Sequence, residues 1–265
     1  MYPFQNAYIR NMYLAIDLGW EYLVLVAVGF AAGFINTLAG GGSLLTLPML
    51  IFLGLPSAVA NGTNRIAIHI QTFFATAGFK SKGVSTFPFN IYLGISAMLG
   101  AFLGAKIAVD IQGEIFNKIL AVIMIVVVAL MVFKPKLEAD FQKERLTGYH
   151  LWVAIFAFFF IGIYGGFINA GIGFIIMLFL HYFNKMSLIR VNATKVSLVF
   201  VYTIGALIMF ALNDKIDWMV GLILAIGNAS GAWVGSRWSV KKGDGVIKAA
   251  MVIMVCLMSL KLWFF

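Results

Sequence analysis

The chain is poor in charge, cysteine and proline. Only 11% of its 265 residues are charged, whereas 62% are hydrophobic and the mean hydropathy is +0.99. Soluble domains carry about 25% charged and about 45–50% apolar residues, so this composition excludes a water-soluble globule. It also excludes a disordered chain, because disorder requires low hydrophobicity and high net charge. We therefore expect a polytopic membrane protein.

Several functional classes are excluded by what is missing. The single cysteine, Cys256, rules out an intrachain disulfide, a CxxC redox pair and a cysteine-rich zinc site. The sequence shows no nucleophile with a paired base, no metal-ligand cluster and no phosphate-binding GxxxxGK. We expect no enzymatic activity, no cofactor and no metal. The net charge is +9, but the cations lie singly between apolar runs, which indicates membrane orientation rather than nucleic-acid binding.

The first 22 residues lack the basic start, apolar run and small-residue cleavage site of a signal peptide. They are rich in aromatic residues, which favour the headgroup level of a bilayer. We expect segment 1–22 to be interfacial.

Eight apolar stretches follow, separated by short polar loops. They span residues 23–54, 58–79, 87–109, 114–133, 150–183, 189–212, 217–238 and 245–264. Six have the length of an ordinary spanning helix, about 20 residues. The stretches 23–54 and 150–183 would each be about 45–50 Å long as one straight helix, well beyond a hydrocarbon core of about 30 Å.

Glycines interrupt both over-long stretches. Gly40, Gly41 and Gly42, followed by Ser43, lie inside the first. Gly165-Gly166 and Gly171-Ile172-Gly173 lie inside the second. We therefore predict that each stretch forms two half-helices, with backbone N–H groups exposed at the break.

Three short matches, in the same order, indicate an internal repeat. Gly33-Phe34-Ile35-Asn36 recurs 133 residues later as Gly166-Phe167-Ile168-Asn169. Two further matches recur 131 residues later: Asn61–Asn64 as Asn192–Lys195, and Gly100–Lys106 as Gly231–Arg237. The sequence thus predicts two transmembrane repeats, residues 23–133 and 148–265, joined by the loop 134–147.

The loop cations decide the expected topology. If each broken stretch returns to its own side as a hairpin, twelve loop cations lie on one face and five on the other. The positive-inside rule then places the central loop in the cytoplasm and both termini outside. Each repeat contains a hairpin and three crossings, an odd number, so the repeats are inverted. The expected fold is an all-α polytopic membrane protein with two inverted-topology repeats, an arrangement typical of secondary transporters.

Charge inside the expected spans is restricted to two residues. All ten acidic residues fall in loops or at span ends, and only Arg65 and Lys195 lie well inside spans, at nearly equivalent places in the two repeats. Intramembrane charge indicates function by default, and paired cations without acidic partners favour an anionic ligand. The alternative is that both side chains snorkel to lipid headgroups.

Polar neighbours complete the predicted site. Asn36 and Asn169 are candidate ligands, although they could equally be interhelical hydrogen-bond glue. His69, one turn beyond Arg65, could carry a proton or pack in the core. The predicted substrate-binding residues are Asn36, Gly40, Gly41, Gly42, Ser43, Asn61, Thr63, Asn64, Arg65, Asn169, Gly171, Gly173, Asn192, Thr194 and Lys195.

Together, the segments 33–48, 60–65 and 231–237 resemble the TauE/SafE family, the sulfite-exporter family of membrane transporters. The likeness covers nearly the whole chain. It implies an inner-membrane permease for small sulfur-containing anions such as sulfite or organosulfonates, and substrate contact by the glycine-rich hairpins and by Thr63-Asn64-Arg65. One departure is Asn36, where some members have aspartate; this puts in doubt any ion coupling that would use that carboxylate.

We therefore expect a secondary transporter, working in the export direction by alternating access around a midplane cationic site. Its expected partners are the anion and membrane lipids, with a homodimer left open. A passive anion channel of the same architecture and a non-transporting membrane scaffold are the alternatives.

Overall fold

The computed structural model describes residues 20–132 and 143–239. Within these residues all regular structure is helical. The expected span 245–264, nearly all of the interfacial segment and most of the loop 134–147 lie outside the described residues.

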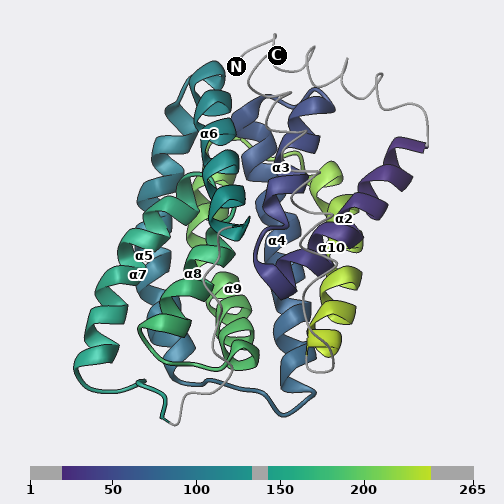
Figure 1. The fold of residues 1–265 in the computed structure, drawn as a ribbon. Helices are drawn as coiled ribbons and strands as arrows, with labels where there is room; N and C mark the ends of the chain where they lie inside the picture. The colour runs from purple at the N-terminus through teal and green to yellow at the C-terminus, as the bar shows by residue number, and fades with distance from the viewer. Residues whose placement is uncertain (1–19, 133–142, 240–265) are drawn as a thin grey trace.

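Nine helices fill the described part of the chain (Figure 1). They are α2 (Trp20–Ala39), α3 (Ser43–Phe52), α4 (Ser57–Lys80), α5 (Phe89–Asp110), α6 (Gly113–Val132), α7 (Tyr149–Phe167), α8 (Ile172–Tyr182), α9 (Leu188–Leu212) and α10 (Trp218–Ser239). Five of them, α2, α5, α7, α9 and α10, are long and apolar enough to cross a bilayer. The chain is a multi-pass membrane protein.

Both over-long stretches are broken, the first at Gly40 to Gly42 as predicted and the second at residues 168–171, which include Gly171, whereas Gly165 and Gly166 lie inside α7. The first stretch leaves the helix after Ala39, where Gly40 has a φ of +79°, and resumes at Ser43. The second leaves after Phe167, where Asn169 and Gly171 have φ values of +54° and +70°. A residue with positive φ cannot continue a right-handed helix, so the prediction of half-helices is confirmed.

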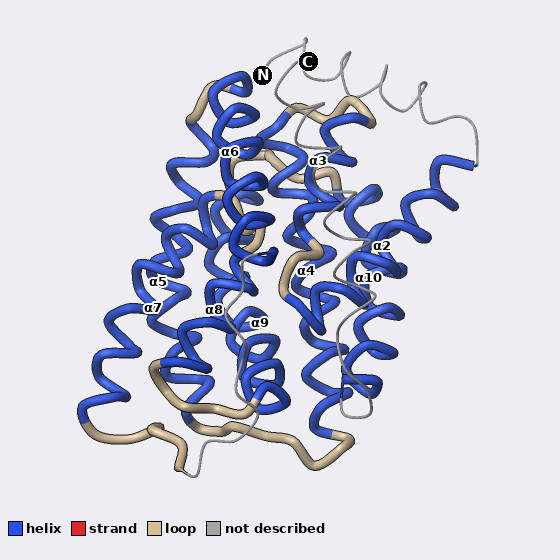
Figure 2. Tube along the Cα trace, in the orientation of Figure 1, coloured by secondary structure: helices blue, strands red, loops and turns tan. Residues whose placement is uncertain are grey.

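The two broken stretches point in opposite directions. In Figure 1 the outer ends of α2 and α3 lie toward the top of the molecule, whereas those of α7 and α8 lie toward the bottom. The loops at the two breaks appear in tan at about half height in Figure 2. The described chain therefore leaves helical geometry near the middle of the bundle, where only buried or cavity-lining backbone is tolerated in a membrane.

Small residues bring the long helices into close contact. Gly100 and Gly104 of α5 lie against backbone carbonyls of α7, and Gly231 and Gly235 of α10 lie against those of α2. The GxxxG spacing therefore serves close packing, as expected from the sequence. The helix pairs α5–α7 and α2–α10 are the most extensive contacts, followed by α4–α10 and α5–α9, while α4 and α9 pack on each other between them.

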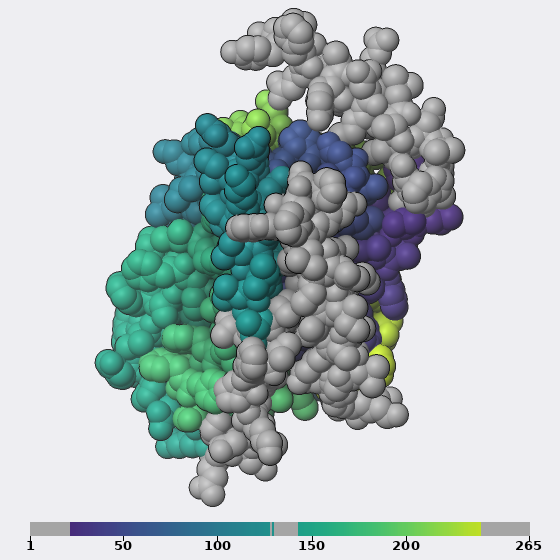
Figure 3. All heavy atoms as spheres, turned by 45° about the horizontal axis from the view of Figure 1, so that its top comes forward, coloured from purple at the N-terminus to yellow at the C-terminus, as the bar shows by residue number. Residues whose placement is uncertain are grey.

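Helix α6 lies over one of the breaks. In the space-filling view it runs as a teal strip beside the green helices of the second half (Figure 3). Val127 of α6 packs against Gly171, so closely that a Cβ at Gly171 would lie 2.5 Å from Val127 Cγ2. This contact explains why residue 171 has no side chain.

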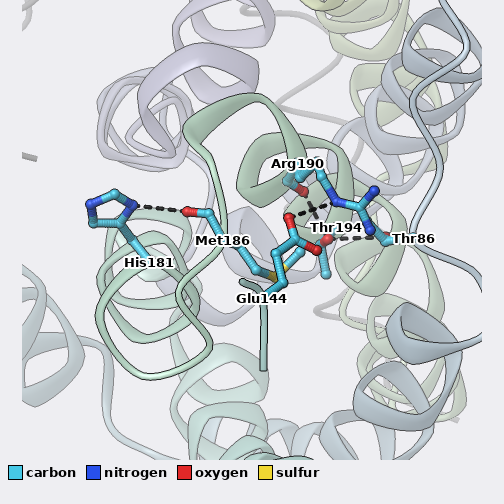
Figure 4. A network of polar contacts seen from close by, with 6 residues as sticks. All are labelled: Thr86, Glu144, His181, Met186, Arg190 and Thr194. Carbon is cyan, nitrogen blue, oxygen red and sulfur yellow. Dashed lines mark hydrogen bonds and ion pairs between the residues drawn. The ribbon is translucent and has the colours of Figure 1, made fainter. Parts of the chain in front are cut away.

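Polar contacts join the loops at the lower end of the bundle (Figure 4). Glu144, in the segment before α7, forms an ion pair with Arg190 of α9 at 2.8 Å. One turn further along α9, Thr194 donates a hydrogen bond to Thr86, which lies just before α5, at 2.9 Å. The starts of α5, α7 and α9 are thereby tied together.

Candidate functional site

Arg65 binds the end of a broken helix. Its side chain is fully buried on α4, and its Nη1 and Nη2 donate to the carbonyl oxygens of Gly165 (2.5 Å) and Gly166 (2.8 Å) in the last turn of α7. The last four carbonyls of a helix have no partner within it and carry the negative end of its dipole. The guanidinium of Arg65 therefore supplies hydrogen-bond donors for two of these carbonyls and a positive charge at the negative end of the helix dipole.

Asn61, one turn before Arg65, strengthens the same contact. Its Oδ1 accepts a hydrogen bond from Arg65 Nη2 at 3.0 Å, and its Nδ2 donates to the Phe167 carbonyl at 2.7 Å. Three consecutive carbonyls of α7, from Gly165 to Phe167, are thus held by two side chains of α4.

Lys195 makes the corresponding contact in the other half of the molecule. It lies on α9, is 2% exposed, and donates from Nζ to the Thr37 carbonyl of α2 (3.1 Å) and to Asn192 Oδ1 (2.8 Å). Its acceptor, Thr37, is 129 residues before Gly166, the acceptor of Arg65. Each cation therefore binds the carbonyl end of a half-helix from the other half of the chain.

These contacts answer the question of snorkelling. Neither head group reaches toward the surface, because both bind carbonyls at the two helix breaks. The Arg65 guanidinium also lies 5.7 Å from the ring centroid of Phe210. The expectation that both cations lie inside the bundle agrees with the structure, whereas headgroup contact does not.

The two breaks touch one another. Gly40 and Gly173 are in direct backbone contact: a Cβ at Gly173 would lie 2.5 Å from Gly40 Cα. Next to them, Asn169 donates from Nδ2 to Ser43 Oγ at 3.0 Å and accepts a hydrogen bond from the Tyr202 hydroxyl. The predicted residues Gly40, Ser43, Asn169 and Gly173 therefore come together.

Two half-helices begin at this meeting point, so the positive ends of their dipoles lie there. Helix α3 starts at Ser43 and α8 at Ile172. Among the described residues, the N–H groups of Gly41, Gly42 and Ser43 donate to no backbone carbonyl outside their own helix. Such groups are the usual donors to an anion at a helix N-terminus.

Other predicted residues lie away from the breaks. Thr63 Oγ1 accepts from the N–H of Asp217 (2.8 Å) before α10, and Thr194 contacts Thr86 before α5. Both threonines thus fix the starts of neighbouring helices. Asn64 is 1% exposed, and its Oδ1 has no hydrogen-bond partner among the described residues.

The four-residue match between the halves is out of structural register. Asn169 lies in the break beyond α7, whereas Asn36 lies inside α2, where its carbonyl accepts the N–H of Gly40 at 2.9 Å. The place of Asn169, a positive-φ residue just beyond a half-helix, is taken in the first half by Gly40. Asn36 itself is half-buried. The two asparagines are therefore not equivalent in the fold.

His69 packs between α4 and α9. Its Nδ1 lies 2.9 Å from Thr203 Oγ1, and its ring stacks on Phe200 with centroids 4.5 Å apart. The side chain is half-buried. A role as proton carrier stays a prediction.

Four buried polar residues of the helices were not predicted from the sequence: Thr37 and Tyr202 at the breaks, and Gln71 and Asn228 between α4 and α10. Gln71 of α4 and Asn228 of α10 are each 1% exposed and form a hydrogen bond of 3.4 Å. Polar side chains inside apolar spans are signals that could have identified Gln71, Asn228 and Tyr202. Thr37 acts through its carbonyl, a group that every residue has, so no sequence signal marks it.

One described acidic residue, Asp217, lies next to a predicted site residue, because its backbone N–H donates to Thr63 Oγ1. The described acidic residues all lie at helix ends or in loops. No group of three or more histidine, cysteine, aspartate or glutamate side chains there could hold a metal ion.

Comparison with known proteins places the chain in a family. The family model "Sulfite exporter TauE/SafE" matches residues 25–262. A "Probable membrane transporter protein" of Haemophilus influenzae is 31% identical over 93% of this chain and 96% of its own length. The "Probable membrane transporter protein YfcA" of Escherichia coli K12 is 31% identical over 90% of this chain and 88% of its own. The "Probable membrane transporter protein ORF9" of a Sinorhizobium species is 28% identical over 93% and 94%.

No solved structure gives a significant match. The names of the relatives are consistent with a role other than catalysis. With its family model matched from residue 25 to residue 262 and its relatives aligned over nearly their whole length, the chain belongs to the TauE/SafE family and is a membrane transporter.

Proposed function

We propose that this protein is a secondary transporter that exports a small sulfur-containing anion, such as sulfite or an organosulfonate, across the inner membrane. Transport proceeds by alternating access around the site where the two helix breaks meet. The family description supports the chemical class. The pair of buried cations at the breaks is the observation that carries the proposal.

The charge balance at the breaks favours an anion. Arg65 and Lys195 neutralise the negative ends of α7 and α2. The positive ends of α3 and α8, which meet at Gly40 and Gly173, then have no counterpart among the described acidic residues. An anion bound there would accept hydrogen bonds from the backbone of Gly41 to Ser43 while the two cations supply the field. Arg65 and Lys195 thus act on the substrate mainly through charge and through the shape of the breaks.

The proposal includes two inverted repeats, with the central loop in the cytoplasm and both termini outside. Support comes from the opposite directions of the α2–α3 and α7–α8 hairpins (Figure 1) and from the matching cation contacts. Helix pairing is also matched, since α2 packs on α10 as α7 packs on α5. Access would alternate as one hairpin moves against the other.

Counterflow in proteoliposomes tests the function. Purified protein is reconstituted and uptake of labelled sulfite is measured with and without unlabelled sulfite inside the vesicles. A carrier predicts faster labelled uptake with internal sulfite, and taurine or sulfoacetate inside should compete if organosulfonates are carried. Uptake unaffected by internal substrate would indicate a channel and overturn alternating access.

Variants connect that assay to the site. Lys195→Gln keeps a hydrogen-bond donor but removes the charge, so counterflow should fall by at least about tenfold, the factor that about 1.4 kcal/mol of lost interaction gives. Lys143→Gln, a change at an exposed loop cation, is the matched control and should leave counterflow unchanged. Equal counterflow in both variants, with both proteins folded by gel filtration, would contradict the anion site.

A further inference from the structure

An apolar groove runs along the outside of the bundle, between α4 and α10. Its volume is about 640 Å³, and its lining includes Ile70 and Phe74 of α4 with Leu222, Ile226 and Trp233 of α10. Several of these side chains are open to the surroundings: Ile226 is 64% exposed, Leu222 51% and Phe74 40%. The groove therefore faces outward and is separate from the site at the helix breaks.

A cation lies at one end of the groove. The Arg237 guanidinium stacks over the Trp233 ring, with Cζ 3.8 Å from the ring centroid. Trp233 in turn meets the ring of Phe74 edge-on, with centroids 6.5 Å apart. Arg237 Nε has no hydrogen-bond partner among the described residues. The positive charge of Arg237 thus lies on the ring face of Trp233 at the end of the groove.

Further positive charge gathers at the same end. Gly78 lies directly against Ser236 Oγ, so the last turns of α4 and α10 are side by side. Lys80, the last residue of α4, and Lys82 in the following loop are exposed there. Trp238, next to Arg237, is 43% exposed, as expected of a tryptophan at the level of the headgroups.

We propose that this groove binds an anionic phospholipid, with an acyl chain along the apolar floor and the phosphate on Arg237. The floor offers almost no polar atoms, which suits a hydrocarbon chain. A guanidinium matches the paired oxygens of a phosphate, and its stacking on Trp233 holds it in place. Lys80 and Lys82 add charge that selects an anionic lipid over a zwitterionic one. The site does not depend on the proposed transport activity.

Native mass spectrometry of the full-length protein in a neutral detergent tests the site. Phosphatidylglycerol and phosphatidylcholine with the same acyl chains are titrated in parallel. The intact protein should retain phosphatidylglycerol with an affinity about tenfold higher, because phosphatidylcholine carries a choline cation next to the same phosphate and the charges of Lys80 and Lys82 repel it. Lys80→Gln combined with Lys82→Gln should abolish this preference. Arg237→Gln should weaken binding of both lipids, because both carry the phosphate, and Ala229→Phe, a change at another lining residue, should also reduce binding of both. Lys106→Gln, at an exposed position of α5, is the control and should change neither.

Two results would overturn the proposal. One is an unchanged affinity for both lipids in Arg237→Gln and in Ala229→Phe. The other is a change in oligomeric state in Ala229→Phe with lipid binding intact, which would assign the groove to a second copy of the chain. Thermal unfolding of each variant separates loss of the site from loss of the fold.

Discussion

Arg65 and Lys195 each donate hydrogen bonds to backbone carbonyls at a helix break inside the bundle. Water is absent at that depth, so an unpaired carbonyl there costs several kcal/mol. Arg65 has two donors aimed at two carbonyls, Gly165 and Gly166, and Lys195 donates to the carbonyl of Thr37. At the scale of single residues, the cations are therefore structural as well as electrostatic.

Truncating Arg65 should destabilise the protein through those carbonyls. Arg65→Ala should lower the free energy of unfolding by about 1–3 kcal/mol for each carbonyl left unpaired. Arg65→Lys, which keeps the charge and one donor, should lose less. Unfolding in mixed micelles measures both, with Lys80→Ala at an exposed helix end as control. An Arg65→Ala variant as stable as the control would show that other groups satisfy α7.

Much of the site was predictable at this scale, and the exceptions have a physical cause. Arg65 and Lys195 were found because a charge in an apolar run is rare. The carbonyls that accept their hydrogen bonds were missed because every residue has a backbone carbonyl, so the sequence does not mark which of them take part. Thr63 was placed with the ligands because the resemblance to the family implies substrate contact by Thr63-Asn64-Arg65. In the structure its Oγ1 accepts from the N–H of Asp217, and its contact with substrate stays a prediction.

At the scale of secondary-structure elements, the main feature is the pair of broken helices. The break between α2 and α3 needs a residue at positive φ and also needs room, because Gly40 faces the backbone of Gly173. These two requirements can be separated. Gly83 has nearly the same φ, +76° against +79°, but nothing lies within 4 Å of its side-chain position.

Alanine at the two positions should give different losses. Gly83→Ala should cost about 1–2 kcal/mol, the usual price of left-handed geometry for a residue with Cβ. Gly40→Ala should cost clearly more, because its Cβ would lie 2.6 Å from Gly173 Cα. Unfolding free energies of the two variants, measured side by side, check this. Equal losses would mean that the contact between the breaks can open freely.

The boundaries of the described helices were well predicted from the sequence, while the register between the two halves was not. Helix ends lie within a few residues of the expected stretches, because the apolar runs end where polar loops begin. The four-residue match failed as a guide to register because Asn36 lies a full turn before its break, whereas Asn169 lies beyond the end of α7. The two halves of the chain are aligned more reliably by equivalent contacts in the structure than by identical residues in the sequence.

In the molecule as a whole, helices of one half of the chain pack on helices of the other half. Helix α2 packs on α10, α7 packs on α5, and each buried cation reaches across to the opposite half. This arrangement requires the two broken stretches to return to the sides from which they start. That requirement is a matter of topology and can be tested without a transport assay.

Cysteine accessibility in intact cells should reveal the hairpins. In a Cys256→Ser background, single cysteines replace Gly54, Gly148 and Lys185, in the loops flanking α3, α7 and α8. An impermeant maleimide should label position 54 from outside and positions 148 and 185 only after permeabilisation. Labelling of 148 and 185 from opposite sides would mean that the α7–α8 stretch crosses the bilayer, which contradicts the inverted arrangement.

The contact of Gly40 with Gly173 has a mechanical consequence. Ordinary helix contacts resist sliding, because side chains of one surface sit in the grooves of the other and must leave them before the surfaces can shift. Where the two breaks cross, backbone meets backbone with no side chain between them. Displacement of one hairpin along the other needs no change of rotamer at these glycines, so the barrier to motion is set by the hydrogen bond between Asn169 and Ser43 beside them and by the surrounding helices.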